Sequence, residues 1–112
     1  MGAYEYQGTS TGVRLASFKA TAGTDGIVKV TWRTATETDN AGFHLWRSQL
    51  RNGKYTRLTE EIIPAEGSAF EGARYRFDDL TTRHGKTYFY KLEAVNFEGL
   101  STFHGQVRVQ VK

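Results

Sequence analysis

Between Gly85 and Gly99 the chain alternates large apolar side chains with other residues, a pattern typical of a β-strand with one buried face. The buried face would consist of residues at every second position: Tyr88, Tyr90, Leu92 and Ala94. Turn-forming residues stand at both ends of the run. We expect this segment to be the central strand of a β-sandwich, with the other strands packed against its tyrosine and leucine face.

Composition agrees with a single folded domain. The chain has 112 residues, of which 38% are hydrophobic and 24% charged, as in ordinary globular domains. No stretch reaches the roughly 18 apolar residues of a membrane-spanning helix, so no membrane insertion is expected. The 12 acidic residues are spread among 15 basic ones, which argues against nucleic-acid binding. The absence of cysteine excludes disulfides and thiolate metal sites.

Six further segments carry the signature of short strands, so we predict about seven in all. Trp32 is expected at the centre of the core, with its indole N–H requiring one acceptor, and Leu45 is expected to face inward beside it. Phe18 breaks the alternation of the first strand, which indicates a bulge at a sheet edge. The six segments span residues 13–18, 27–34, 43–47, 54–58, 73–77 and 107–111.

The connections carry turn and loop signals. Asn52-Gly53 predicts a type I′ hairpin, because both central positions of that turn need positive φ. Residues 35–42 are expected to form a polar loop, and Pro64 argues against a central strand in its segment. Residues 1–12 are polar and are interpreted as a linker or frayed end, which leaves residues 13–112 as the domain.

The chain resembles a fibronectin type III module. The matching residues are Trp32, Phe43, Leu45 and the alternating run from Tyr88 to Ala94. The resemblance implies a seven-stranded, antiparallel, immunoglobulin-like sandwich. It also implies a tyrosine corner, in which the Tyr88 hydroxyl bonds to the preceding crossover.

A narrower resemblance is to type III-like modules near the C-termini of secreted or surface-exposed bacterial proteins. It rests on the segments WRTATE at 32–37, NAGF at 40–43 and RS at 47–48. It implies an extracellular or cell-surface location. No adhesion tripeptide of the RGD type is present, so integrin-style adhesion is not implied.

The strongest candidate for an interaction surface is the outer face of one sheet. Alternation places Trp46 and Phe89 outward on neighbouring strands, where their rings would lie within reach of each other. Such aromatic side chains can stack on a sugar or pack on a neighbouring domain; the alternative is local packing, with Lys91 lying on the indole. Tyr55 is a further candidate for this face, and Lys91 and His44 would border it.

Other polar groups have weaker claims. Lys29, Arg33, Arg74 and Arg76 should share the outer face of the other sheet, which could bind an anionic polymer or be a solvated face. The loop from Glu37 to Asn40 could hold calcium, but it lacks a regular ligand pattern, and bonding of Asp39 and Asn40 to nearby backbone N–H groups is favoured.

No catalytic constellation is evident in the sequence. The histidines His44, His84 and His104 lie on separate segments, and no serine has a GxSxG context. Asp78 and Asp79 should point to opposite faces of a strand, and we expect them to cap and solvate the crossover. We therefore expect neither enzymatic activity nor a cofactor.

The resulting hypothesis is a non-catalytic module that acts as a spacer or protein-interaction domain. Its partners would be neighbouring domains of a larger bacterial surface protein, and the isolated domain would be monomeric. The alternatives are a carbohydrate-binding module that uses Trp46 and Phe89, and an accessory domain of a secreted hydrolase.

Overall fold

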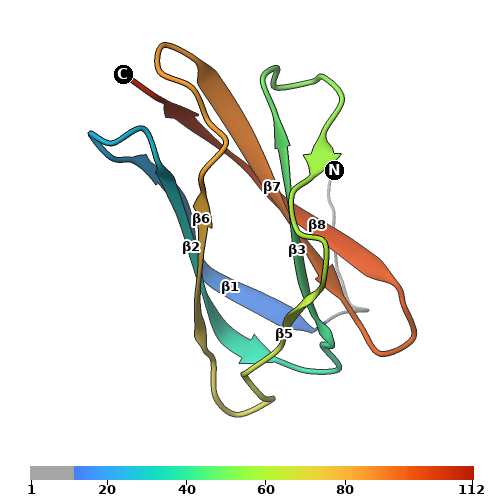
Figure 1. The fold of residues 1–112 in the computed structure, drawn as a ribbon. Helices are drawn as coiled ribbons and strands as arrows, with labels where there is room; N and C mark the ends of the chain where they lie inside the picture. Colours follow the sequence, from blue (N-terminus) through green and yellow to red (C-terminus); the bar gives the residue numbers. More distant parts are fainter. Residues whose placement is uncertain (1–11) are drawn as a thin grey trace.

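The computed structural model describes residues 12–112, which form two antiparallel β-sheets packed face to face (Figure 1). The predicted linker at residues 1–12 lies outside this range except for Gly12. The described residues contain no helix that could cross a membrane. The eight strands are β1 (Val13–Ala22), β2 (Val28–Glu37), β3 (Gly42–Ser48), β4 (Thr56–Arg57), β5 (Ile63–Pro64), β6 (Arg74–Asp79), β7 (Thr87–Val95) and β8 (Ser101–Gln110).

One sheet has the order β1-β2-β6, and the other has the order β4-β3-β7-β8 with β5 also paired to β3. The all-β sandwich predicted from the alternation is therefore confirmed, with eight strands instead of seven. The additional strand is the two-residue β5, where Pro64 lies opposite Gly42. Gly42 makes this pairing feasible, since a Cβ there would lie 2.3 Å from the carbonyl oxygen of Ile63.

The core lies between the sheets and is built from the residues at alternate positions. Trp32 is stacked on Tyr75 with their ring centroids 5.3 Å apart, and Phe43 meets both rings edge-on. Leu92 on β7 lies opposite Leu45 on β3, and both are fully buried. Within the described residues the indole N–H of Trp32 has no acceptor, contrary to the expectation that it would find one.

The edge strands β1 and β8 contain irregularities. In β1 the register shifts on either side of Leu15, leaving Ala16 without an opposite residue, and beyond it Phe18 packs against the core. The bulge expected from the position of Phe18 is therefore present, two residues earlier. In β8 the register shifts near Gly105, whose φ of 108° few other residues adopt. Such bulges discourage the edges from pairing with other chains.

Two local predictions are wrong. The segment expected as a polar loop from residue 35 continues as strand β2 to Glu37, because it pairs with β1 as far as Val13. The turn before β4 is not type I′, since neither Asn52 nor Gly53 has positive φ. It is instead closed by a 3.1 Å bond from the N–H of Gly53 to the carbonyl of Leu50, within a longer connection.

The two ends of the described chain lie at opposite ends of the sandwich. At one end Gly12 accepts a bond from the N–H of Thr38, beside the β2–β3 connection and the β7–β8 turn. At the other end Val111 exchanges bonds with Gly85 and Lys86, just before β7 begins. The strands run between these ends, and the longest principal dimension is 39 Å (Figure 1).

Candidate interaction surfaces

The outer face of the β4-β3-β7-β8 sheet carries the predicted aromatic surface. Trp46 lies opposite Lys91, and Phe89 lies opposite Ser48, so the two aromatic residues are diagonal neighbours, as expected. However, the guanidinium of Arg51, from the connection after β3, lies 5.0 Å above the ring of Phe89. Phe89 is only 8% exposed, so the prediction of an open Phe89 ring is wrong.

Trp46 remains partly exposed but is held by its neighbours. Its indole N–H donates a 2.8 Å bond to Glu93, and its ring meets Phe103 edge-on at 6.0 Å and 64°. Lys91 lies 4.4 Å above the ring of Tyr55 and not over the indole. Trp46 and Phe103 are therefore inclined to each other and do not form the coplanar platform on which a sugar would stack.

Phe103, which is 51% exposed, was not singled out from the sequence. Alternation along β8 would have placed it inward, on the same side as Val107, Val109 and Val111. That count fails at the bulge near Gly105, which exchanges the two faces of the strand. The exposed part of the aromatic surface therefore consists of Trp46 and Phe103, not of Trp46 and Phe89.

His44 borders this surface and is tied to the sheet edge. Its Nδ1 lies 2.6 Å from the hydroxyl of Thr59, which also accepts a bond from the N–H of Leu45. Burial and the nearby positive charge of Arg57 lower the pKa of His44, while Glu93 opposes this shift. His44 is therefore biased toward its neutral form and positions the segment after β4.

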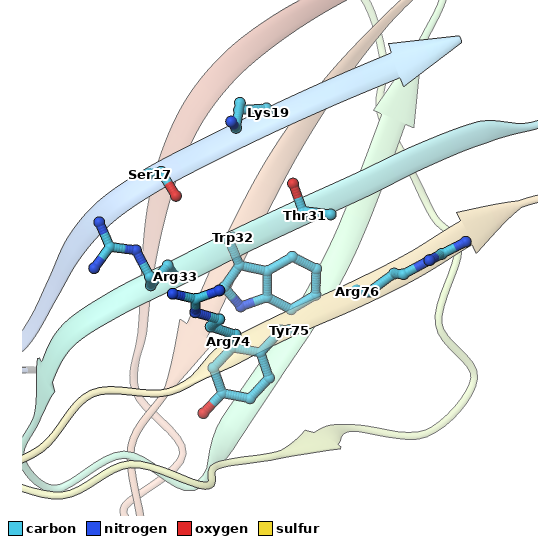
Figure 2. Close-up of a pocket in the computed structure, with 8 residues that line it drawn as sticks. All are labelled: Ser17, Lys19, Thr31, Trp32, Arg33, Arg74, Tyr75 and Arg76. Carbon is cyan, nitrogen blue, oxygen red and sulfur yellow. The ribbon is translucent and has the colours of Figure 1, made fainter. Parts of the chain in front are cut away.

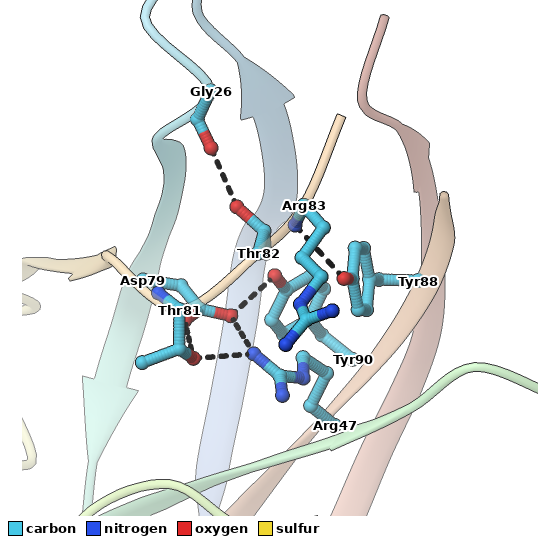
Figure 3. Close-up of polar contacts among 8 residues, drawn as sticks. All are labelled: Gly26, Arg47, Asp79, Thr81, Thr82, Arg83, Tyr88 and Tyr90. Atoms are coloured by element: carbon cyan, nitrogen blue, oxygen red, sulfur yellow. Dashed lines mark hydrogen bonds and ion pairs between the residues drawn. The ribbon is translucent and has the colours of Figure 1, made fainter. Parts of the chain in front are cut away.

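A buried carboxylate joins the two sheets. Asp79, at the end of β6, accepts hydrogen bonds from Tyr90 at 2.7 Å and from Arg47 at 2.8 Å, and two from Thr81 (Figure 3). Burial alone would raise the pKa of Asp79, but these hydrogen bonds outweigh burial and lower it. Burial and the Asp79 carboxylate raise the pKa of Tyr90. Asp79 caps the crossover by accepting the Thr81 N–H, as expected, but it is buried, so the expectation that it also solvates the crossover is wrong.

The tyrosine corner forms in the same region. The Tyr88 hydroxyl lies 3.0 Å from the backbone N–H of Arg83, so it bonds to the crossover as the resemblance implied (Figure 3). The hydroxyl is the acceptor of this bond. Thr82 fastens the crossover from the other side by donating to the carbonyl of Gly26 at 2.6 Å. The crossover is therefore bonded to both sheets.

Glu37, a candidate calcium ligand, is instead the acceptor at the centre of a buried cluster. Its carboxylate accepts bonds from the hydroxyls of Tyr75 and Thr34 at 2.5 and 2.7 Å, and from the Asn40 amide and the Gly67 N–H at 3.1 and 3.3 Å. These donors occupy the oxygens that a cation would need. The cluster attaches the segment before β6 to the end of β2.

The remaining candidates do not converge. Among residues 12–112, no three His, Asp or Glu side chains are grouped so that they could hold a metal ion. His84 contacts the carbonyl of Lys112 at one end of the sandwich, whereas His104 lies in β8, where burial lowers its pKa. Asp39 accepts only a weak 3.4 Å bond from the N–H of Phe97.

The outer face of the β1-β2-β6 sheet is basic, as predicted. A shallow trough of about 610 Å³ runs across it (Figure 2). Arg33 lies directly opposite Arg74, and Thr31 lies directly opposite Arg76. Lys19 of β1 completes the row that contains Thr31.

Comparison with known proteins supports the fold assignment. No protein-family model matches the sequence, and no curated protein matches it. The structure is similar to the crystal structure of a Fn3-like protein from Clostridium thermocellum, with a TM-score of 0.61 and 19% sequence identity. The similarity covers 88% of this chain and 91% of that chain. The described residues therefore form a fibronectin type III-like β-sandwich.

Proposed function

We propose that this protein is a non-catalytic module that separates and orients neighbouring domains of a larger extracellular bacterial protein. The observation that carries the proposal is the placement of Gly12 and Val111 at opposite ends of the sandwich. Domains attached at the two ends would be held apart by the length of the module. A fibronectin type III-like fold is typically non-catalytic and, in bacteria, often extracellular, which agrees with this role.

The bonding at both ends supports a fixed separation. Gly12 is bonded to Thr38, and Val111 is bonded to Gly85 and Lys86, so the described chain enters and leaves as part of the folded unit. The buried bonds of Asp79 and Tyr90 hold the two sheets together. A Gly/Ser linker of comparable residue count would instead sample a broad range of distances, with a root-mean-square value of about 55 Å.

The test uses the native polypeptide that carries this module. Spin labels on the two flanking domains would report the distribution of their separation. We expect a narrow distribution that becomes broad when residues 13–112 are replaced by a Gly/Ser linker of equal residue count. A polypeptide without flanking domains, or one with the same broad distribution before and after replacement, would contradict the spacing role.

A second role, as a contact surface for another domain, is supported by Trp46 and Phe103. These side chains are the exposed apolar part of the aromatic surface, and their inclined rings suit the irregular surface of a protein domain better than a planar sugar. The partner would be a neighbouring domain or another surface protein, and we propose this ahead of polysaccharide binding.

NMR spectroscopy can separate these partners. The indole resonance of Trp46 should shift when the flanking domains are attached, and should not shift when a soluble neutral polysaccharide is added. Trp46→Ala should remove the interdomain contact, whereas Tyr55→Ala, in the connection just before β4, should retain it. If only the polysaccharide moves the resonance, the carbohydrate-binding alternative replaces this proposal.

A further inference from the structure

The outer face of the β1-β2-β6 sheet has an ordered arrangement of cations and hydroxyls. Strand register places its outward residues in three rows across the sheet. Four of the five cations lie in the first two rows, which line the trough (Figure 2). The rows are Ser17–Arg33–Arg74, Lys19–Thr31–Arg76 and Thr21–Lys29–Asp78. A hydroxyl therefore accompanies the cations in every row.

Two of these arginines have no anionic partner within the described residues. Arg76 is paired with Asp78 at 2.9 Å, whereas neither Arg33 nor Arg74 makes an ion pair there. Like charges directly opposite each other on a sheet are destabilising. Both side chains are exposed, so the N–H groups of their guanidinium groups are available to a ligand.

We propose that this trough binds a sulfated polysaccharide. A sulfate group above Arg33 and Arg74 would relieve their repulsion and accept hydrogen bonds from both guanidinium groups. A sulfate presents three oxygens, which can accept hydrogen bonds from two guanidinium groups. A carboxylate presents only two oxygens, which a single guanidinium group can bind. A second sulfate would lie over Lys19 and Thr31, about 6.6 Å farther along the strands.

The rest of the face favours sugar over nucleic acid. Single-stranded nucleic acids need aromatic side chains on which bases stack. The three rows contain none. Trp32 and Tyr75 also line the trough (Figure 2), but both are buried and stacked on each other in the core, so their faces are not open to a base. Ser17 and Thr31 supply hydroxyls that can bond to sugar hydroxyls. This site lies on the side of the sandwich, so its occupation is compatible with domains attached at both ends.

Isothermal titration of residues 1–112 with heparin, polygalacturonate and single-stranded oligothymidylate would test the proposal, because the three polymers present sulfates, carboxylates and phosphates. The test variant is Arg33→Ser with Arg74→Ser. The control variant is Arg57→Ser with Arg108→Ser, which removes the same charge from exposed positions on the other sheet. A urea midpoint for each variant would verify that it is folded.

We expect heparin to bind most tightly and the test variant to weaken that binding at least about tenfold, as expected for losing charge-assisted hydrogen bonds. The control variant should weaken it less than about threefold, since it removes only distant charge. Equal weakening by both variants, or no heparin binding, would overturn the site. Tighter binding of polygalacturonate or oligothymidylate would overturn the assignment to a sulfated sugar.

Discussion

The hydroxyl of Tyr90 donates a 2.7 Å hydrogen bond to the buried carboxylate of Asp79, and this bond connects the two sheets. Tyr90 belongs to β7 and Asp79 to β6, which lie in different sheets. Arg47, on β3, donates to the same carboxylate from the side that is nearer to solvent. A sandwich held mainly by apolar contacts thus contains one charged connection across its interior.

Tyr90→Phe tests that connection. The substitution keeps the ring but removes one of the donors to Asp79, and leaving a buried acceptor short of donors costs about 1–3 kcal/mol. Asp79→Ala should cost more, about 3–5 kcal/mol, because it leaves Arg47 without its buried partner. Urea unfolding would measure both values. Asp78→Ala, one residue away and exposed, should change the free energy of unfolding little; a comparable loss there would show that the position of Asp79 is not special.

Leu92→Ala tests the packing of the core. Leu92 is fully buried opposite Leu45, so the substitution removes apolar contacts and leaves a cavity. The expected loss is about 2–5 kcal/mol in the free energy of unfolding. Leu50→Ala is the matched control, because Leu50 is 68% exposed and should contribute little. Similar midpoints for the two variants in denaturant would contradict the assigned orientation of β7.

Tyr88→Phe tests the tyrosine corner. The change leaves the backbone N–H of Arg83 without its acceptor. We expect the free energy of unfolding to fall by about 1–3 kcal/mol, with a smaller loss where water reaches this N–H. The same amide should exchange its hydrogen faster in the variant, which NMR can follow at this one position. Unchanged exchange at Arg83 would mean that the hydroxyl does not hold the crossover.

Stability should fall in mildly acidic solution because of His104. Burial lowers the pKa of His104 below its ordinary value of 6.5, so the unfolded chain takes up the proton first as the pH falls. The stabilising contribution is therefore present above about pH 6.5 and is lost as the pH falls toward the folded-state pKa. His104→Gln should reduce the loss measured by urea unfolding between about pH 7.5 and 5.

His44 shifts in the same direction, so the test requires His44→Gln and the double variant beside His104→Gln. The double variant should show the flattest pH profile in this range. Asp79 acts in a separate range, because its lowered pKa preserves its contribution until the pH falls below about 4. A wild-type profile that is flat down to about pH 5 would contradict the assigned burial of His104.

The alternation of side chains determined much of this fold from sequence alone. It assigned Trp32, Leu45, Tyr88, Tyr90 and Leu92 to the interior, where all five are buried. This works because successive residues of a strand point to opposite faces, so burial on one face appears directly as a period of two. The same rule placed Lys29, Arg33, Arg74 and Arg76 outward, and the three arginines among them line the trough.

Tertiary structure decided the properties that depend on residues distant in the chain. The ring of Phe89 is covered because a long connection brings Arg51 over it, and no local pattern encodes that contact. Asp79 is buried because Arg47 and Tyr90, which lie 32 and 11 residues away, supply its donors. Alternation counted from Tyr75 would place Asp79 inward, but a charged side chain is stable there only when folding assembles enough hydrogen bonds around it.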